Sequence, residues 1–205
     1  AAREAKPDAV LVPKTQSTDD VRRVRDAVGL PDTPIWCMIE TPRGVSNAKD
    51  IADHCSALVM GTVDLANELR CSTDPKLERM PLMTALQMVV MAAKASTAAG
   101  GCVALDGVWV HLDDDAGFAK EAAQGLALGF DGKTLIHPKT IDAANAVFSP
   151  TPAALAHAKR IVEAYASTRG GAVRVDGKLV EELHIRRARA LLATADALAQ
   201  RGASA

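Results

Sequence analysis

Residues 35–44 read IWCMIETPRG, five apolar residues followed by Glu40 and a turn-forming Thr-Pro-Arg-Gly segment. A short, uninterrupted apolar run that ends at turn residues is typical of a strand buried on both faces. Four more apolar runs follow this pattern, at residues 9–12, 57–60, 102–105 and 133–136. A helical pattern follows each run, so the sequence predicts five βα units that form a parallel sheet covered by helices.

An ionisable residue stands at or just past the carboxyl end of each predicted strand: Lys14, Glu40, Asp64, Asp106 and His137. A (β/α)8 barrel, or TIM barrel, gathers all of its strand ends around one pocket. An open doubly wound sheet usually binds its ligand with a glycine-rich phosphate loop, and the sequence has neither GxGxxG nor a P-loop motif. The α/β pattern therefore favours the barrel. Because a closed barrel has about eight units, we expect the others to come from outside residues 1–205 or from another chain.

The segment SPTP at residues 149–152 is predicted to end a compact unit. We therefore divide the chain into residues 1–150, which hold the five βα units, and a C-terminal extension over residues 151–205. The extension is predicted to contain a hairpin between two helices, at residues 153–168 and 182–201. Asp176-Gly177 fits the type I′ turn of such a hairpin. We interpret the extension as a lid or an oligomer contact.

The composition excludes several classes of partner. The chain has 205 residues, with 24 Lys and Arg against 25 Asp and Glu, and a net charge of −1. This balance argues against nucleic acid or an anionic membrane as the main partner. The most apolar predicted helix, residues 82–99, is too polar and too short for a membrane span, and no signal peptide opens the chain. Four scattered cysteines without a CxxC pair indicate reduced thiols in a cytosolic enzyme, so we expect a cytoplasmic protein: Cys37, Cys55, Cys71 and Cys102.

Glu40 and Asp64 are the candidate metal ligands. They follow neighbouring predicted strands, so their carboxylates can converge on one hard cation. Mg²⁺ takes few protein carboxylates and fills its shell with waters and substrate oxygens, which suits the activation of a 2-oxo or 2-hydroxy acid. The alternative interpretation is that Glu40 pairs with Arg43 and Asp64 caps the helix that it begins. Asp64 can do both, because capping leaves one oxygen free.

The remaining candidates each have a functional and a structural interpretation. Backbone N–H groups of Gly61-Thr62-Val63 can hold a substrate carboxylate, or the segment is a plain tight turn. Lys14 is a substrate-facing cation or a surface ion-pair residue. Asp106 is a catalytic carboxylate or holds the turn at Gly107. His137 is a general base or a structural histidine, and the cluster at residues 113–115 is explained by helix capping.

An ordered set of motifs resembles the citrate lyase beta-subunit-like family of CoA-ester lyases. The match runs from about residue 8 to residue 150 and also includes the tail VDGKLVE at residues 175–181. Its motifs are VPK at 12–14, IETPRG at 39–44, GTVDL at 61–65, ALDGV at 104–108, and GFDGK at 129–133 with IHP at 136–138. Each motif alone is weak, but their common order and spacing are specific.

The resemblance implies a TIM barrel, usually assembled as a homotrimer or hexamer, that binds Mg²⁺ and cleaves or forms 3-hydroxyacyl-CoA thioesters. By resemblance, Glu40 and Asp64 match the Mg²⁺ ligands, and the loop Gly61-Thr62-Val63 matches the one that holds the keto-acid carboxylate beside them. The segment Ile136-His137-Pro138 resembles the loop that lines the CoA passage.

Two features depart from the family pattern. Glu181 stands where several members carry an Asp that reaches into a neighbouring subunit's site as acid or base. Its longer side chain is expected to mark a subfamily with a different reaction. The family's first three strands, which carry an acidic patch and a substrate-binding Arg, have no counterpart here. The chain thus resembles strands 4–8 of the barrel, and we expect the parent polypeptide to be longer by roughly three βα units.

The predicted function is that of a Mg²⁺-dependent carbon–carbon lyase acting on a citryl-, malyl- or citramalyl-CoA type thioester. Retro-Claisen cleavage would give acetyl-CoA and a 2-oxo acid, with the metal acidifying the hydroxyl and Glu181 of a neighbour protonating the enolate. Three alternatives stay open. These are a malyl-CoA thioesterase that admits water, a class II pyruvate aldolase acting on free hydroxy-keto acids, and a non-catalytic binding subunit.

Overall fold

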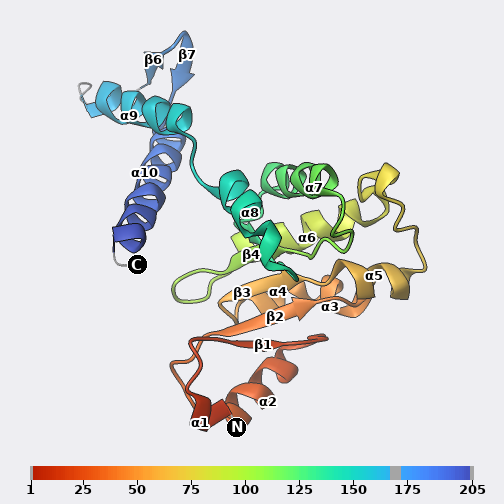
Figure 1. The fold of residues 1–205 in the computed structure, drawn as a ribbon. Helices are drawn as coiled ribbons and strands as arrows, with labels where there is room; N and C mark the ends of the chain where they lie inside the picture. The colour runs from red at the N-terminus through yellow and green to blue at the C-terminus, as the bar shows by residue number, and fades with distance from the viewer. Residues whose placement is uncertain (1, 167–171, 204–205) are drawn as a thin grey trace. The chain divides into compact units, whose positions relative to one another are not determined.

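The computed structural model describes residues 2–166 and 172–203. The chain forms two compact units, residues 1–148 and residues 149–205, and each is described by itself. Figure 1 shows the first unit as a sheet with helices packed against it and the second as two helices with a small hairpin.

The first unit is built on a five-stranded parallel sheet in the order β1-β2-β3-β4-β5 (Figure 1). The strands are β1 (Val10–Val12), β2 (Ile35–Ile39), β3 (Ala57–Met60), β4 (Val103–Asp106) and β5 (Gly132–Lys133). The parallel α/β prediction is therefore confirmed, with β5 shorter than expected and one residue earlier. Within the described residues the sheet is open, with β1 and β5 at its edges. It therefore contains only some of the strands of the predicted barrel.

Helices follow the strands at the predicted places. They are α1 (Ala2–Ala5), α2 (Thr18–Val28), α3 (Pro42–Ser46), α4 (Ala48–Ala52), α5 (Thr62–Leu69), α6 (Met83–Lys94), α7 (Asp115–Leu128) and α8 (Ile141–Phe148), with short 3-10 turns η1 (Pro75–Leu77), η2 (Met80–Leu82) and η3 (Pro138–Thr140). Ser17 and Asp20 form a capping box at the start of α2, and Asp114 caps α7. Both caps satisfy backbone N–H groups that a helix leaves without partners.

Two helices differ from the prediction for a visible reason. A helix is predicted near residues 47–54; α4 covers residues 48–52 of this range, and a further short helix, α3, precedes it. Asn47 separates the two, and its side-chain amide donates to the Gln16 carbonyl at 2.8 Å. The helix expected to reach residue 99 ends at Lys94. Beyond it, Ser96 and Thr97 donate to the Ala52 carbonyl and the Asp53 carboxylate. These long-range hydrogen bonds draw the chain out of the helix and toward α4.

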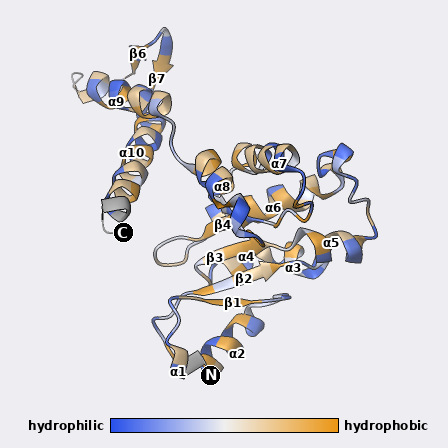
Figure 2. Ribbon diagram, viewed as in Figure 1, coloured by the Kyte–Doolittle hydropathy of each residue, from blue (hydrophilic) through white to orange (hydrophobic). Residues whose placement is uncertain are grey.

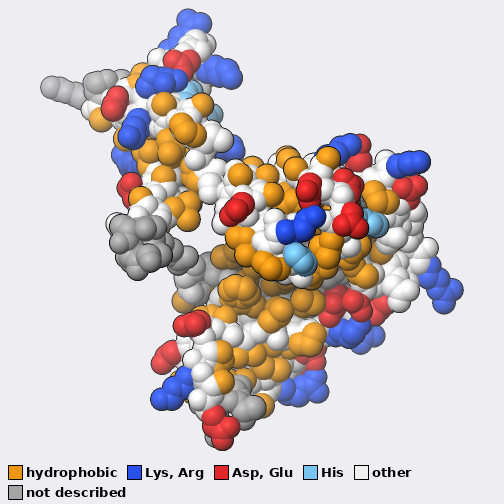
Figure 3. All heavy atoms as spheres, viewed as in Figure 1, with side chains coloured by type: hydrophobic (Ala, Val, Ile, Leu, Met, Phe, Trp, Pro, Cys, Tyr) orange, Lys and Arg blue, Asp and Glu red, His pale blue; other side chains and the backbone are white. Residues whose placement is uncertain are grey.

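One face of the sheet packs against the helices and forms the core. The register aligns Val12, Cys37, Leu58 and Ala104 across four strands, and all four side chains are buried in the core cluster. On the opposite face, Leu11, Trp36 and Val103 are 43 %, 36 % and 43 % exposed. Figure 2 shows the apolar character of the strands and Figure 3 the hydrophobic side chains that gather over them. Since parallel sheets are normally covered on both faces, this second face has the composition of a barrel interior.

The four cysteines are free thiols in this structure, and the Sγ atoms of Cys55 and Cys102 lie 3.9 Å apart. Across the described residues, no helix has both the length and the apolar content that crossing a membrane requires.

The second unit consists of α9 (Pro152–Ala166), the antiparallel hairpin of β6 (Val173–Val175) and β7 (Lys178–Val180), and α10 (Glu182–Ala203). Asp176 and Gly177 connect the strands with φ values of 50° and 79°, as the predicted type I′ turn requires. The unit has a core of its own, which includes Ile161, Val180 and Ile185. The last two residues of the helix predicted over 153–168 lie outside the described residues.

Candidate active site

Glu40 follows β2 and is only 5 % exposed. Its Oε1 accepts a hydrogen bond of 2.8 Å from the backbone N–H of Lys14, at the end of the neighbouring strand β1. Lys14 has a φ of 48°, a left-handed conformation that costs energy for a residue other than glycine. Directly after Glu40, Thr41 caps α3 and Pro42 occupies its first turn. The predicted Glu40–Arg43 pair is replaced by this contact between strand ends.

Asp64 lies in the first turn of α5, directly after β3. Its Oδ1 is 2.7 Å from Nζ of Lys14, and both side chains are about half exposed. This hydrogen bond raises the pKa of the Lys14 ammonium, so the group stays protonated. Asp64 does not cap α5, because the cap position is Gly61 and no side chain bonds there. The free amides of the first turn attract negative charge, which favours Asp64 at this place.

Lys14 therefore connects the two predicted metal ligands. Its backbone N–H binds Glu40 and its ammonium binds Asp64, so both carboxylates converge on one residue at the carboxyl edge of the sheet. The positive charge of the Lys14 ammonium attracts both carboxylates, Asp64 through a direct hydrogen bond and Glu40 through its negative charge. Sequence reasoning identified Lys14 as a candidate cation but did not predict this bridging position.

Gly61 allows the loop before α5 to approach Glu40 closely. A Cβ built at Gly61 would lie 2.3 Å from Cβ of Glu40 and 2.7 Å from its Oε2. No real side chain fits at such distances, so the glycine is required by the close approach. The loop Gly61-Thr62-Val63 thus runs directly over Glu40 into the first turn of α5, where helical N–H groups lack intrahelical partners.

The donor set at this edge fits a magnesium ion. Within the described residues, no group of three or more His, Cys, Asp or Glu side chains is placed to hold a metal. A centre built on Glu40 and Asp64 would therefore rely on two carboxylates. Mg²⁺ is commonly held by one or two carboxylates, with waters and substrate oxygens completing its octahedral shell.

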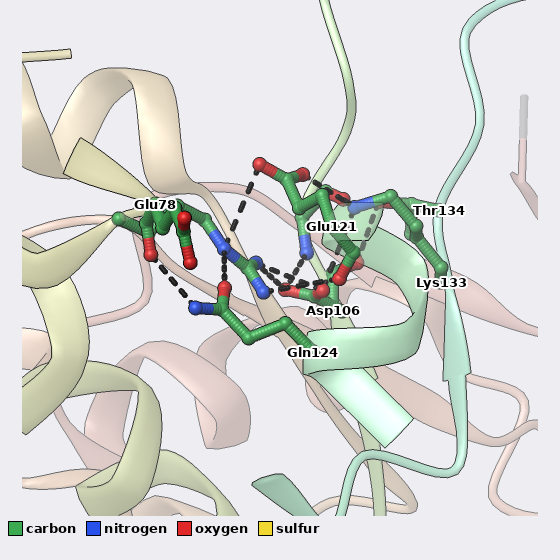
Figure 4. A network of polar contacts seen from close by, with 8 residues as sticks. Glu78, Asp106, Glu121, Gln124, Lys133 and Thr134 are labelled. Atoms are coloured by element: carbon green, nitrogen blue, oxygen red, sulfur yellow. Dashed lines mark hydrogen bonds and ion pairs between the residues drawn. The ribbon is translucent and has the colours of Figure 1, made fainter. Parts of the chain in front are cut away.

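Asp106, the predicted catalytic carboxylate, lies at the end of β4 with contacts of a different kind. Its side chain is fully buried, and Arg79 Nη1 donates to its two oxygens at 2.7 and 2.9 Å. In the strand it shares a face with Ala104, the face that packs on helices. Figure 4 shows Asp106 enclosed by Glu121, Gln124 and Lys133. A carboxylate held in this way has the contacts of a structural acceptor.

The network around Asp106 contains residues that the sequence did not single out. Arg79 also donates through Nε to Gln124 at 2.8 Å, and Lys133 Nζ lies 2.7 Å from Glu121 Oε1. Two cations and two carboxylates are thereby paired in a nearly solvent-free place, as buried charges require. The only local signals were a lone Arg in a loop and a lone Lys at the start of the strand predicted over residues 133–136.

The other predicted positions have contacts of their own in the described residues. His137 Nδ1 accepts from the backbone N–H of Lys139 at 3.1 Å and caps η3, a structural role. Ile136 is 55 % exposed, and Pro138 begins the turn. Glu181 belongs to the second unit, where it precedes α10 with an exposed side chain and its N–H donates to His184 Nδ1 at 3.0 Å.

A cavity of about 460 Å³ adjoins the first turn of α5. Thr62 and Val63 form one wall, and Trp109, Leu82 and Arg79 contribute to the others. Its lining is mainly apolar, and such concave apolar spaces are the usual form of small-molecule sites. The cavity shares Thr62 and Val63 with the predicted substrate loop but not the segment at residues 136–138.

Comparison with known proteins places these features in a family. Residues 2–138 match the HpcH/HpaI aldolase/citrate lyase family. The chain is 45 % identical over 204 residues to a (3S)-malyl-CoA thioesterase of Cereibacter sphaeroides, covering 97 % of this chain and 69 % of that protein. It is 35 % identical over 204 residues to the citrate lyase subunit beta of Escherichia coli, covering 92 % of this chain and 66 % of that protein.

A solved structure has a similar fold. The CitE protein of Mycobacterium tuberculosis, in complex with magnesium, acetoacetate and coenzyme A, superposes with a TM-score of 0.76 at 27 % identity. The match covers 92 % of this chain and 68 % of that one. These relatives are enzymes that act on CoA esters, and the resemblance seen in the sequence motifs is confirmed. The chain belongs to the HpcH/HpaI aldolase/citrate lyase family.

Proposed function

We propose that this chain carries the metal site of a Mg²⁺-dependent enzyme that cleaves the carbon–carbon bond of a 3-hydroxyacyl-CoA thioester of the malyl-CoA type. The observation that carries the proposal is the convergence of Glu40 and Asp64 on Lys14, directly beneath the loop that begins α5. The malyl-CoA thioesterase at 45 % identity and the magnesium- and CoA-bound CitE structure support the substrate class and the metal.

The residues of the site would have separate roles in binding the metal, binding the substrate carboxylate and stabilising developing negative charge. Glu40 and Asp64 would hold Mg²⁺, which supplies Lewis-acid polarisation of the substrate oxygens when bound. The N–H groups of Thr62 and Val63, in the first turn of α5, would bind the carboxylate of the acid half, whereas the Gly61 N–H already donates to the Ile39 carbonyl at 2.9 Å. Lys14, whose ammonium donates to Asp64 at 2.7 Å, would add positive charge where negative charge develops during bond cleavage. Together these groups favour departure of the acetyl-CoA enolate from a 2-oxo acid.

Hydrolysis of the same thioester is a second candidate function. The relative at 45 % identity is named as a malyl-CoA thioesterase, whereas the citrate lyase beta subunit stands at 35 %. Both reactions begin with the same metal-bound acid half and differ in whether water reaches the thioester carbonyl. An aldolase reaction on free hydroxy-keto acids would use the same carboxylates without the CoA moiety.

Product analysis with (3S)-malyl-CoA distinguishes these functions. With Mg²⁺ present we expect glyoxylate and acetyl-CoA in equal amounts. Chromatography of the CoA species measures the products. Malate and free CoA instead would establish the thioesterase, and cleavage of free 4-hydroxy-2-oxo acids alone would establish the aldolase. Turnover is expected to stop in EDTA and to return with Mg²⁺. Turnover that persists after chelation would contradict the metal assignment.

We also propose that Glu181 acts as the acid or base in the site of a neighbouring copy of the chain, in a trimer or hexamer. Its exposed carboxylate, at the start of α10 and outside the unit that holds Glu40 and Asp64, supports this arrangement. Two inactive variants, Glu181→Gln and Asp64→Asn, should then complement each other when co-expressed. Random mixing restores about a quarter of the sites in a closed symmetric ring. Mixed oligomers that stay inactive would place Glu181 outside the partner's site.

A further inference from the structure

Lys133 is a fully buried cation behind the substrate loop. It ends β5 beside Asp106 of β4, and its side chain has no solvent exposure. Nζ donates to the Gly107 carbonyl at 2.5 Å and to Glu121 Oε1 at 2.7 Å, and it lies 3.5 Å from Asp106 Oδ2 (Figure 4). An ammonium has three donors, and all three have acceptors here. Burying a charge on this scale is costly unless every partner is in place.

The network holds the backbone of Gly107 from both sides. Its carbonyl accepts from Lys133, and its N–H donates to Asp106 Oδ1 at 2.8 Å. Arg79 Nη1 donates to both oxygens of Asp106 and pairs with it as a cation. Among the described contacts, Glu121 pairs with Lys133 and Arg79 but not with Gly107. Within this network, Lys133 and Asp106 are thus the residues that form hydrogen bonds with the backbone of Gly107.

The backbone of Gly107 in turn packs closely against Thr62 of the predicted substrate loop. A Cβ at Gly107 would lie 2.7 Å from Thr62 Oγ1, 2.9 Å from Thr62 Cγ2 and 3.1 Å from the Met60 carbonyl. The glycine therefore packs its backbone directly on the first residue of α5. Because Asp64 lies in the same turn, the place of Gly107 sets the place of the predicted metal ligand and of the amides beside it.

We infer that Lys133 is a positioning residue for the metal and oxo-acid site, acting through the Gly107 carbonyl on Thr62 and hence on the first turn of α5. The inference rests on the proposed function. It goes beyond it by assigning a binding consequence to a buried ion network that touches neither metal nor substrate. Partners that orient metal ligands in this indirect way typically change metal affinity by about 10- to 100-fold when they are removed.

Three variants separate a positioning role from a purely structural one. Lys133→Met removes the ammonium and leaves an excess carboxylate. Glu121→Gln removes a charge from the same network without touching Gly107, and is the matched control. Lys133→Met with Glu121→Gln restores the charge balance but not the hydrogen bond to Gly107. The probe is Mn²⁺ with oxalate, whose binding is followed by the EPR signal of free Mn²⁺, while thermal unfolding is followed by circular dichroism.

We expect Lys133→Met to weaken the binding of Mn²⁺ and oxalate by about 10-fold or more, and Glu121→Gln to leave it within about twofold. The double variant should regain thermal stability relative to Lys133→Met but not the lost affinity. An affinity that recovers together with the melting temperature would reduce Lys133 to a structural role and overturn the inference. So would an unchanged affinity in Lys133→Met.

A variant that keeps all network charges provides an independent test. Gly107→Ala retains Lys133, Asp106 and Arg79, and places a methyl group against Thr62. We expect a folded protein whose affinity for Mn²⁺ and oxalate falls as in Lys133→Met. Undiminished affinity would show that Gly107 transmits nothing to α5. If the unaltered protein binds no Mn²⁺, the proposed function fails and this inference fails with it. Binding that survives every variant rejects this inference alone.

Discussion

We expect the substitution Asp64→Asn to abolish Mg²⁺-dependent turnover and to leave the fold intact. Asn retains the shape of the side chain but not its charge, and a neutral amide is a poor ligand for a hard cation. Lewis-acid stabilisation is worth several kcal/mol, and each 1.36 kcal/mol is tenfold in rate. The expected loss in kcat/KM is therefore about a thousandfold or more. Steady-state kinetics with malyl-CoA and a Mg²⁺ titration measure it.

The fold should tolerate this change because the Asp64 side chain is half exposed and forms its ion pair with Lys14, which is about equally exposed. Ion pairs of this kind contribute about 0–1 kcal/mol to the free energy of unfolding. Glu68→Gln, one turn later on the exposed side of α5, is the matched control and should keep full activity. Equal activity losses in both variants would mean that the charge of α5 matters and the metal assignment does not hold.

Gly61→Ala disrupts the site more broadly, because the new methyl group displaces Glu40. The added Cβ would stand 2.3 Å from Cβ of Glu40, an atom tied to the backbone, so the loop or the end of β2 must move. Overpacking of this kind costs about 1–3 kcal/mol in the free energy of unfolding. A displaced metal ligand lowers metal affinity by about 10- to 100-fold. Denaturant unfolding and a Mn²⁺ titration report the two effects separately.

Gly132→Ala is the matched control for Gly61→Ala. It lies in the same sheet, and its added Cβ would meet only the end of the Leu105 side chain, at 3.1 Å. A flexible side-chain end can shift by a few tenths of an ångström, so metal affinity should stay near that of the unaltered protein. If Gly61→Ala also binds Mn²⁺ normally, the close approach of the loop to Glu40 has no role in holding the metal.

The strands and helices were predictable because their signals are local. Apolar runs ending at turn residues located β2 and β3 to the residue, and capping residues placed the beginnings of α2 and α7. The helix ends that differed were decided by hydrogen bonds to distant residues, such as Thr97 to Asp53 across 44 positions. A local pattern carries no information about such partners.

The sequence by itself determined the parallel α/β order, the family motifs, and the acidic residues at neighbouring strand ends. Only the tertiary structure decided which of those residues meet. Lys14 reaches Asp64 across 50 positions, whereas Asp106 turns to the helix-covered face and meets Arg79 across 27. The physical reason lies in strands that are apolar on both faces. Their sequence lacks the alternation that would reveal where a terminal carboxylate points, so register and packing choose its partner.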